Sequence, residues 1–237
     1  IGLRTPLTGD PAYDGLEVQI LDNSAKRFQQ ITAESRHGSL YGVAAAKSGH
    51  LKPVGEWNTQ EIACIGNQLR VKLNGVTILD TKLDQTGTVI TPDGKAHPGL
   101  QRRSGHIALM GQKSRVLFRN LRIHAGRQFD STSTKEHIAP TSEWDELFNG
   151  KNLDGWTPSN TKQWKVLAGA IQGDAPAGGK SWSALTSDHD YDDYEFSFQY
   201  RLAKGSRARV LLRSNRGLPG DPHDEGAQIQ LIDDDAQ

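Results

Sequence analysis

The sequence lacks the features that mark several common classes of protein. Cys64 is the only cysteine in 237 residues, so no internal disulfide is possible. The cysteine content therefore does not indicate an oxidising or a reducing compartment. Lysine plus arginine and aspartate plus glutamate balance at 28 each, which leaves no net charge to attract a nucleic acid or an anionic membrane. No apolar run is as long as the segment of about 18 residues that is needed to span a bilayer. We therefore expect no nucleic-acid partner and no membrane span.

Several catalytic and metal-binding motifs are also missing. There is no G-x-S-x-G, no H-E-x-x-H and no Cys/His set with zinc spacing. Residues 173–181 fail the phosphate-loop pattern, because the first glycine comes one position too early. Aspartates cluster in 187–193, but the twelfth position from Asp188 is Gln199 rather than glutamate, which excludes an EF-hand. We expect no cofactor, with a different kind of calcium site at these aspartates as the open alternative.

A phrase is present twice, once near each end of the chain. Residues 2–25 and 211–236 align with a two-residue insertion in the second copy. The matched pairs include Arg4 with Arg213, Gln19 with Gln230 and Asp22 with Asp233. Such a repeat predicts that the chain begins inside one unit and ends inside the next. We assign 1–126 to the back part of a first unit, 127–142 to a linker and 143–237 to the front part of a second.

Two arrangements of these parts stay open. The two halves complete a single sandwich in permuted order, or the chain is a fragment of a tandem array. In either case both copies of the repeated phrase cannot occupy the same strand positions. A displaced or unfinished sheet edge would pair with another molecule, which predicts a homo-oligomer as a further possibility.

Apolar and polar residues alternate with a period of two through most of the sequence, which predicts strands. Residues 61–80 contain the turns Gly66-Asn67 and Asn74-Gly75 between apolar runs, and this pattern predicts a three-stranded meander. Further strands are expected at 106–109, 115–123, 194–202 and 207–213, and a hairpin around Ala168-Gly169. No long amphipathic helix is present. The fold class is therefore all-β, a sandwich of two antiparallel sheets.

The polar faces of several predicted strands carry arginine, glutamine and glutamate rather than lysine, threonine and serine. One sheet would present Arg4, Glu17 and Gln19, and its copy would present Arg209, Arg213, Gln228 and Gln230. Guanidinium and carboxamide groups have fixed donor and acceptor geometry that suits sugar hydroxyls. The alternative is an ordinary solvated sheet face.

Two groups of segments have more specific patterns. The first group comprises GLRT and GDPAYDGLEVQILDN within 2–23, GSLYG at 38–42, KPVGEWN at 52–58, the strand–NG–strand at 69–80, and SGHIAL and VLFRNLRI within 104–123. The second comprises LFNGKNLDGW at 147–156, WKVLAGAIQG at 164–173, DYEFSFQYRL at 193–202 and RVLLRS at 209–214. The first group resembles the back two-thirds of the 3-keto-disaccharide hydrolase family, and the second resembles its front third.

The resemblance implies a concanavalin A-like jelly-roll sandwich, sometimes in tandem copies, and a secreted or periplasmic protein of sugar metabolism. It also implies a substrate, an oxidised di- or oligosaccharide. A ketone at sugar C3 acidifies the C2 proton, so a general base can remove it, the group at C1 departs, and water then adds. We assign Glu17 as the base, Arg4 as the group that stabilises the enolate and Gln19 as an orienting group.

Aromatic and polar residues complete the predicted substrate site. Tyr41 and Trp57 are expected to stack on the sugar ring, although a tryptophan packed under the sheet is the equal alternative for Trp57. The other predicted substrate contacts are Asp22, Arg213 and Gln230.

Two departures from the family pattern keep other functions open. Residues 110–113 lack the histidine of the QDHG-like turn that many members carry, and Gln228 replaces Glu17 in the second copy. Glutamine cannot act as a base. The alternatives to a hydrolase are a non-catalytic carbohydrate-binding module and a structural module of a larger extracellular protein.

Overall fold

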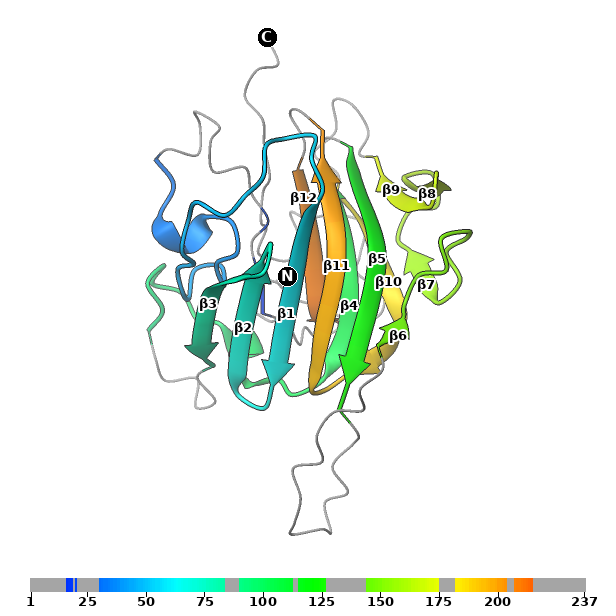
Figure 1. The fold of residues 1–237 in the computed structure, drawn as a ribbon. Coiled ribbons are helices and arrows are strands. Elements are labelled where there is room, and N and C mark those ends of the chain that lie inside the picture. The colour runs from blue at the N-terminus through cyan, green and yellow to red at the C-terminus, as the bar shows by residue number, and fades with distance from the viewer. Residues whose placement is uncertain are drawn as a thin grey trace, which may run out of the picture.

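Strands carry almost all of the regular structure in the computed structural model (Figure 1). It describes residues 16–18, 20, 30–83, 90–112, 115–126, 144–174, 182–203 and 207–214. The strands form two layers, and every strand pairing in them is antiparallel. This confirms the all-β sandwich expected from the alternating pattern.

The larger layer is an eight-stranded sheet with the order β3-β2-β1-β11-β5-β9-β8, and β6 also pairs with β5. Its strands are β3 (Val76–Lys82), β2 (Gln68–Leu73), β1 (Asn58–Ile65), β11 (Tyr194–Leu202), β5 (Val116–Ala125), β9 (Ala170–Gly173), β8 (Trp164–Leu167) and β6 (Asp145–Glu146).

The smaller layer is a four-stranded sheet with the order β12-β4-β10-β7. Its strands are β12 (Arg207–Ser214), β4 (Gly105–Gln112), β10 (Trp182–Tyr191) and β7 (Trp156–Pro158), and the described helices are the short 3-10 turns η2 (Ala33–Ser35) and η3 (Pro98–Gln101). No helix in the described part of the chain is long and apolar enough to cross a membrane.

Strands from the two halves of the chain alternate within both sheets. In the large sheet β11 lies between β1 and β5, with Phe196 opposite Ile62 on one side and Ile123 on the other. In the small sheet β10 and β12 lie on either side of β4. The described strands therefore share two sheets and one interior, while the domain boundaries themselves stay a prediction.

Strand β11 shows how the sequence pattern builds the core. Its inward residues Tyr194, Phe196, Phe198 and Tyr200 are each at most 1% exposed, as the alternation predicts. The rings of Phe196 and Phe198 stack at 4.9 Å, and burial of such rings supplies much of the driving force for folding. The residues between them point away from the core. They give the large sheet a polar outer face.

Two predicted turns are confirmed by their backbone geometry. Asn74 and Gly75, with φ of 50° and 85°, join β2 to β3. Ala168 and Gly169, with φ of 49° and 72°, join β8 to β9. Positive φ at both central positions gives a turn whose twist matches that of the strands. Cys64 is buried and free, as expected from its apolar neighbours.

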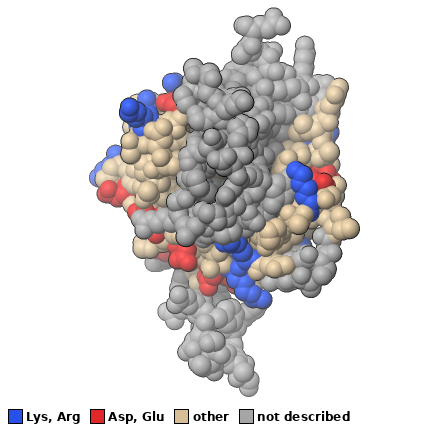
Figure 2. All heavy atoms as spheres, turned by 180° about the vertical axis from the view of Figure 1, so that it is seen from behind, with Lys and Arg blue, Asp and Glu red and all other residues tan. Residues whose placement is uncertain are grey.

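Figure 2 views the molecule from behind, on the side of the four-stranded sheet. The described lysine and arginine side chains on this face lie near its margins, among aspartate and glutamate side chains. The described part of this face therefore mixes charges of both signs at its edges.

Candidate functional site

Glu17 lies in a buried segment of the chain. Its residue is 1% exposed, and its neighbours Leu16 and Val18 belong to the core. Val18 forms an antiparallel bridge with Leu40, which fixes this segment against the loop that follows residue 37. A carboxylate in such a setting is held away from bulk water, as a general base in a closed site requires.

Tyr41 and Glu17 are joined through their backbones. The backbone N–H of Tyr41 donates a 2.7 Å hydrogen bond to the carbonyl oxygen of Glu17. This bond joins the predicted base to one of the two predicted stacking residues. Both residues come from the first group of family-like segments.

The residue after Tyr41 contacts a third segment. Gly42 has a φ of 68° and accepts a 3.3 Å hydrogen bond from the backbone of Asp93. A Cβ at Gly42 would collide with the carboxylate of Asp93, and it would come within 3.0 Å of Nε2 of His97. Glycine is required here by both the left-handed backbone and the close approach.

Asp93 and His97 form a shielded pair beside this glycine. Nε2 of His97 lies 3.1 Å from Oδ2 and 3.2 Å from Oδ1 of Asp93, and the two side chains are 1% and 22% exposed, in that order. Asp93 also accepts a 2.6 Å bond from the Thr91 hydroxyl and a 3.1 Å bond from the Lys95 amide. Desolvation raises the pKa of Asp93, but these hydrogen bonds together outweigh it and hold the pKa below its ordinary value.

Sequence reasoning did not single out the Asp93–His97 pair. The two residues are four positions apart, a spacing that brings side chains together on a helix but has no such meaning in a loop. They meet because the turn at residues 91–94 and the 3-10 turn η3 fold the loop back onto Gly42. The TPDG letters of residues 91–94 indicate a turn, but they do not indicate what the turn contacts.

Trp57 lies on a different face of the molecule. Its ring is 3.9 Å from the guanidinium carbon of Arg119 and 4.9 Å from that of Arg201, both on the outer face of the large sheet. On the inner face, His37 stacks on Tyr200 at 5.9 Å, just before the segment that contains Tyr41. The structure therefore does not bring Trp57 together with Glu17 and Tyr41. Whether Trp57 contacts a sugar stays a prediction.

The structure describes no side-chain position for the remaining predicted site residues. Arg4, Gln19, Asp22 and Gln230 lie outside the described residues, and so does Gln228. Arg213 belongs to strand β12 of the small sheet. The roles assigned to these residues stay predictions.

The aspartates near residue 190 bond to neighbouring protein groups. Asp188 accepts a 2.7 Å bond from Thr157, and Asp193 accepts a 2.8 Å bond from the amide of Gly66. Within the described ranges, no group of three or more histidine, cysteine, aspartate or glutamate side chains is arranged to hold a metal ion. Calcium binding stays the untested alternative.

Among the comparisons with known proteins, a family profile matches most of the chain. The profile of the 3-keto-alpha-glucoside-1,2-lyase-like domain matches residues 1–124 and 143–237. No curated protein matches the chain. Among solved structures, one named "Putative glycosyl hydrolase from Parabacteroides distasonis ATCC 8503" is 17% identical, with a TM-score of 0.33. The match covers 80% of this chain and 63% of that one.

Proposed function

Because this chain belongs to the family of the 3-keto-alpha-glucoside-1,2-lyase-like domain, we propose that it cleaves 3-keto-glycosides by elimination followed by hydration. The substrate is a di- or oligosaccharide oxidised at C3. Membership of the family supports a glycoside hydrolase-like function. The position of Glu17 supports this particular reaction.

The proposed reaction needs one base and one stabilised oxyanion. The carboxylate of Glu17 takes the proton from C2, and the electron pair moves to the C3 oxygen to give an enolate. The C1–O bond then breaks as the enolate collapses, and the leaving oxygen takes up a proton. Water adds back across C1 and C2, so the net change is hydrolysis. In this scheme Arg4 stabilises the enolate and Gln19 orients the ring.

The observation that supports the proposal is the position of Glu17. It is a carboxylate in a core segment, its backbone is bonded to Tyr41, and Gly42 in turn contacts the Asp93–His97 pair. Burying a carboxylate or an imidazole costs free energy unless the group is paired, and such groups gather at functional sites. Glu17 as base, with His97 as a second group able to transfer protons, gives these residues such a role.

The test compares oxidised and unoxidised substrates. A panel of 3-keto-glycosides and their parent glycosides is incubated with the protein, and release of the group at C1 is measured. We expect cleavage of the oxidised set alone. Glu17→Gln keeps the shape of the side chain and should lower kcat by about 100-fold or more, with an unchanged circular dichroism spectrum. Unchanged turnover in this variant would remove Glu17 from the mechanism.

A non-catalytic carbohydrate-binding module is the second candidate. Gln228 replaces Glu17 in the second copy of the repeated phrase, and a glutamine binds sugar hydroxyls but cannot take a proton. This function predicts affinity for the oxidised sugars without any product. A structural module predicts neither binding nor cleavage. Secretion or a periplasmic location is likewise proposed from the family alone.

A further inference from the structure

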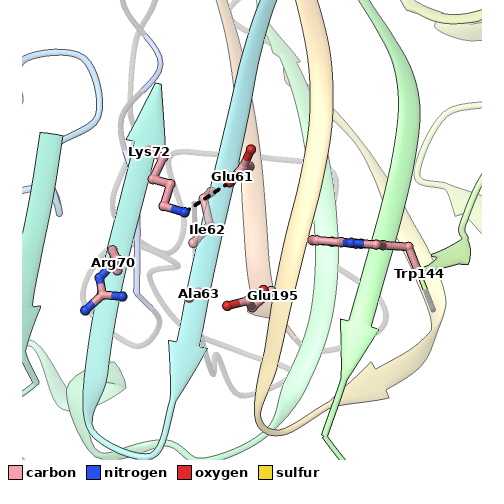
Figure 3. Close-up of a pocket in the computed structure, with 7 residues that line it drawn as sticks. All are labelled: Glu61, Ile62, Ala63, Arg70, Lys72, Trp144 and Glu195. Atoms are coloured by element: carbon pink, nitrogen blue, oxygen red, sulfur yellow. Dashed lines mark ion pairs between the residues drawn. The ribbon is translucent and has the colours of Figure 1, made fainter. Parts of the chain in front are cut away.

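A hollow is present on the outer face of the large sheet, the face opposite to the Tyr41 segment. It is lined by Glu61, Ile62, Ala63, Arg70, Lys72, Trp144 and Glu195 (Figure 3). These residues come from β1, β2 and β11, and from the position just before β6. In Figure 3 the side chain of Trp144 reaches across β5 toward β11, while Glu61 and Lys72 lie on the other side.

Two buried nitrogen atoms lie beside Trp144. The guanidinium carbon of Arg122 is 5.5 Å from the indole ring, and the ring of His124 is 5.7 Å from it. Within the described residues, Nε of Arg122 and Nε2 of His124 are buried without a hydrogen-bond partner. A buried polar atom that is left unpaired destabilises the fold. A ligand that entered beside Trp144 and bonded to these atoms would offset part of that destabilisation.

The strand register places a carboxylate beside the same two side chains. Glu195 on β11 is directly opposite His124 on β5, and Ser197 is opposite Arg122. Directly opposite residues have Cβ atoms about 5 Å apart. Trp144 and Glu195 thus line the hollow, and Arg122 and His124 lie next to them.

The other side of the hollow holds charges that are already partly paired. Nζ of Lys72 is 3.6 Å from Glu61, and the two side chains are 43% and 40% exposed. Arg70 is held by Asp80 at 3.0 Å. The hollow therefore offers both donors and acceptors. Two carboxylates would repel an anionic ligand, and the cations would repel a cationic one.

We propose that this hollow is a second carbohydrate-binding site, which takes one unit of a neutral oligosaccharide. The apolar face of a pyranose ring stacks on Trp144, and its hydroxyls bond to Glu61, Lys72 and Glu195. An aromatic face between fixed polar groups is suited to a ring with one apolar side and a polar rim. The proposal does not rest on the proposed cleavage, since no residue of the Glu17 segment takes part.

The experiment uses the whole chain and four unoxidised probes: maltohexaose, cellohexaose, laminarihexaose and xylohexaose. Unoxidised sugars keep binding separate from cleavage. Each is titrated by calorimetry, and tryptophan fluorescence is followed in parallel. We expect at least one probe to bind, Trp144→Ala to weaken it by about tenfold or more, and Trp144→Phe to retain most of the affinity.

Leu167→Ala is the control. Leu167 is a large apolar residue exposed on β8 of the same sheet, and it does not line the hollow. We expect this variant to bind as the parent does. Glu195→Gln removes a carboxylate from the hollow and leaves the ring of Trp144 in place. We expect it to weaken sugar binding without changing the fold.

Three results would overturn the proposal. None of the four probes binds, or Trp144→Ala and Glu195→Gln both bind as tightly as the parent, or Leu167→Ala loses as much affinity as Trp144→Ala. If sodium sulfate displaces the bound sugar, the hollow is an anion site and the proposal is also wrong.

Discussion

Asp93 shows how individual residues set the properties of the candidate site. Its carboxylate is partly withdrawn from water, yet the hydroxyl of Thr91, the amide of Lys95 and the ring of His97 all surround it. The negative form is the one that these groups stabilise, because each can donate to it. The ionised carboxylate therefore helps to hold the loop against Gly42.

The lowered pKa of Asp93 has a defined consequence for stability. A carboxyl whose folded-state pKa is depressed stabilises the fold above its unfolded pKa of about 3.9, and this contribution is lost as the pH falls through the folded value. Asp93→Asn should therefore lower Tm at pH 7, and the difference from the parent should shrink as the pH falls below about 4.

Thermal unfolding measured across this pH range tests the expectation. Glu56→Gln, at an exposed position, is the control and should change little at any pH. A Tm difference for Asp93→Asn that stays constant down to the lowest pH would contradict the assigned role.

The sequence indicates some residues of the site and leaves others hidden. Glu17 stands out as a carboxylate on the polar side of an alternating segment, but the alternation does not predict that it is buried. His97 and Trp144 give no such signal. The position of His97 depends on the path of a loop, and that of Trp144 depends on β6, a strand of two residues that is too short to show a pattern. Contacts between distant segments decide both.

Among the elements, the β2–β3 hairpin is set most clearly by its own residues. The side chain of Asn74 accepts a 2.9 Å bond from the amide of Thr59 and donates 2.8 Å and 2.9 Å bonds to His50 and Asn58. Asparagine thus both tolerates the positive φ of the turn and ties the hairpin to β1 and its preceding loop.

Asn74→Ala should destabilise the protein by about 2 kcal/mol or more, since it loses these bonds and strains the left-handed backbone. Asn74→Gly should destabilise the protein less, because glycine adopts the left-handed backbone without strain, although it does not restore the side-chain hydrogen bonds. The free energy of unfolding from urea titration measures both. Asn67→Ala in the β1–β2 turn, at an exposed position, is the matched control. Equal losses in all three variants would contradict this account.

Strand β5 contains a bulge that the sequence pattern does not predict. Residues 115–123 are expected to form one regular strand, and β5 does occupy this region. The register with β11 shifts between Ser197 and Gln199, where Asn120 has a φ of 53°. The shift lets both Arg119 and Asn120 donate to Gln199. An alternating sequence predicts a strand but not a bulge, because the bulge is defined by the partner strand.

At the scale of the whole molecule, the sheet order determines which parts of the chain depend on one another. The alternating pattern predicts the strands and their two layers, but it contains no information on which strands are neighbours. Packing contacts between segments far apart in the sequence place β11 between β1 and β5. The repeated phrase at the two ends predicts such a permuted order as one of two arrangements.

This sheet order predicts that the halves need each other. Expressed alone, 1–126 lacks β11, so β1 and β5 would have exposed edges and we expect no cooperative unfolding transition. Co-expression of 1–126 with 143–237 should give a complex that unfolds cooperatively, as measured by circular dichroism and size-exclusion chromatography. A cooperative transition of 1–126 by itself would contradict the expectation.

The central place of β11 also has a consequence for how the protein is made. During translation, β1 and β5 leave the ribosome well before residues 194–202, so the central strand of the large sheet is missing until most of the described chain has been synthesised. Inserting β11 requires contacts between distant segments, which slows folding. We therefore expect the nascent protein to depend on chaperones that shield the unpaired edges of β1 and β5.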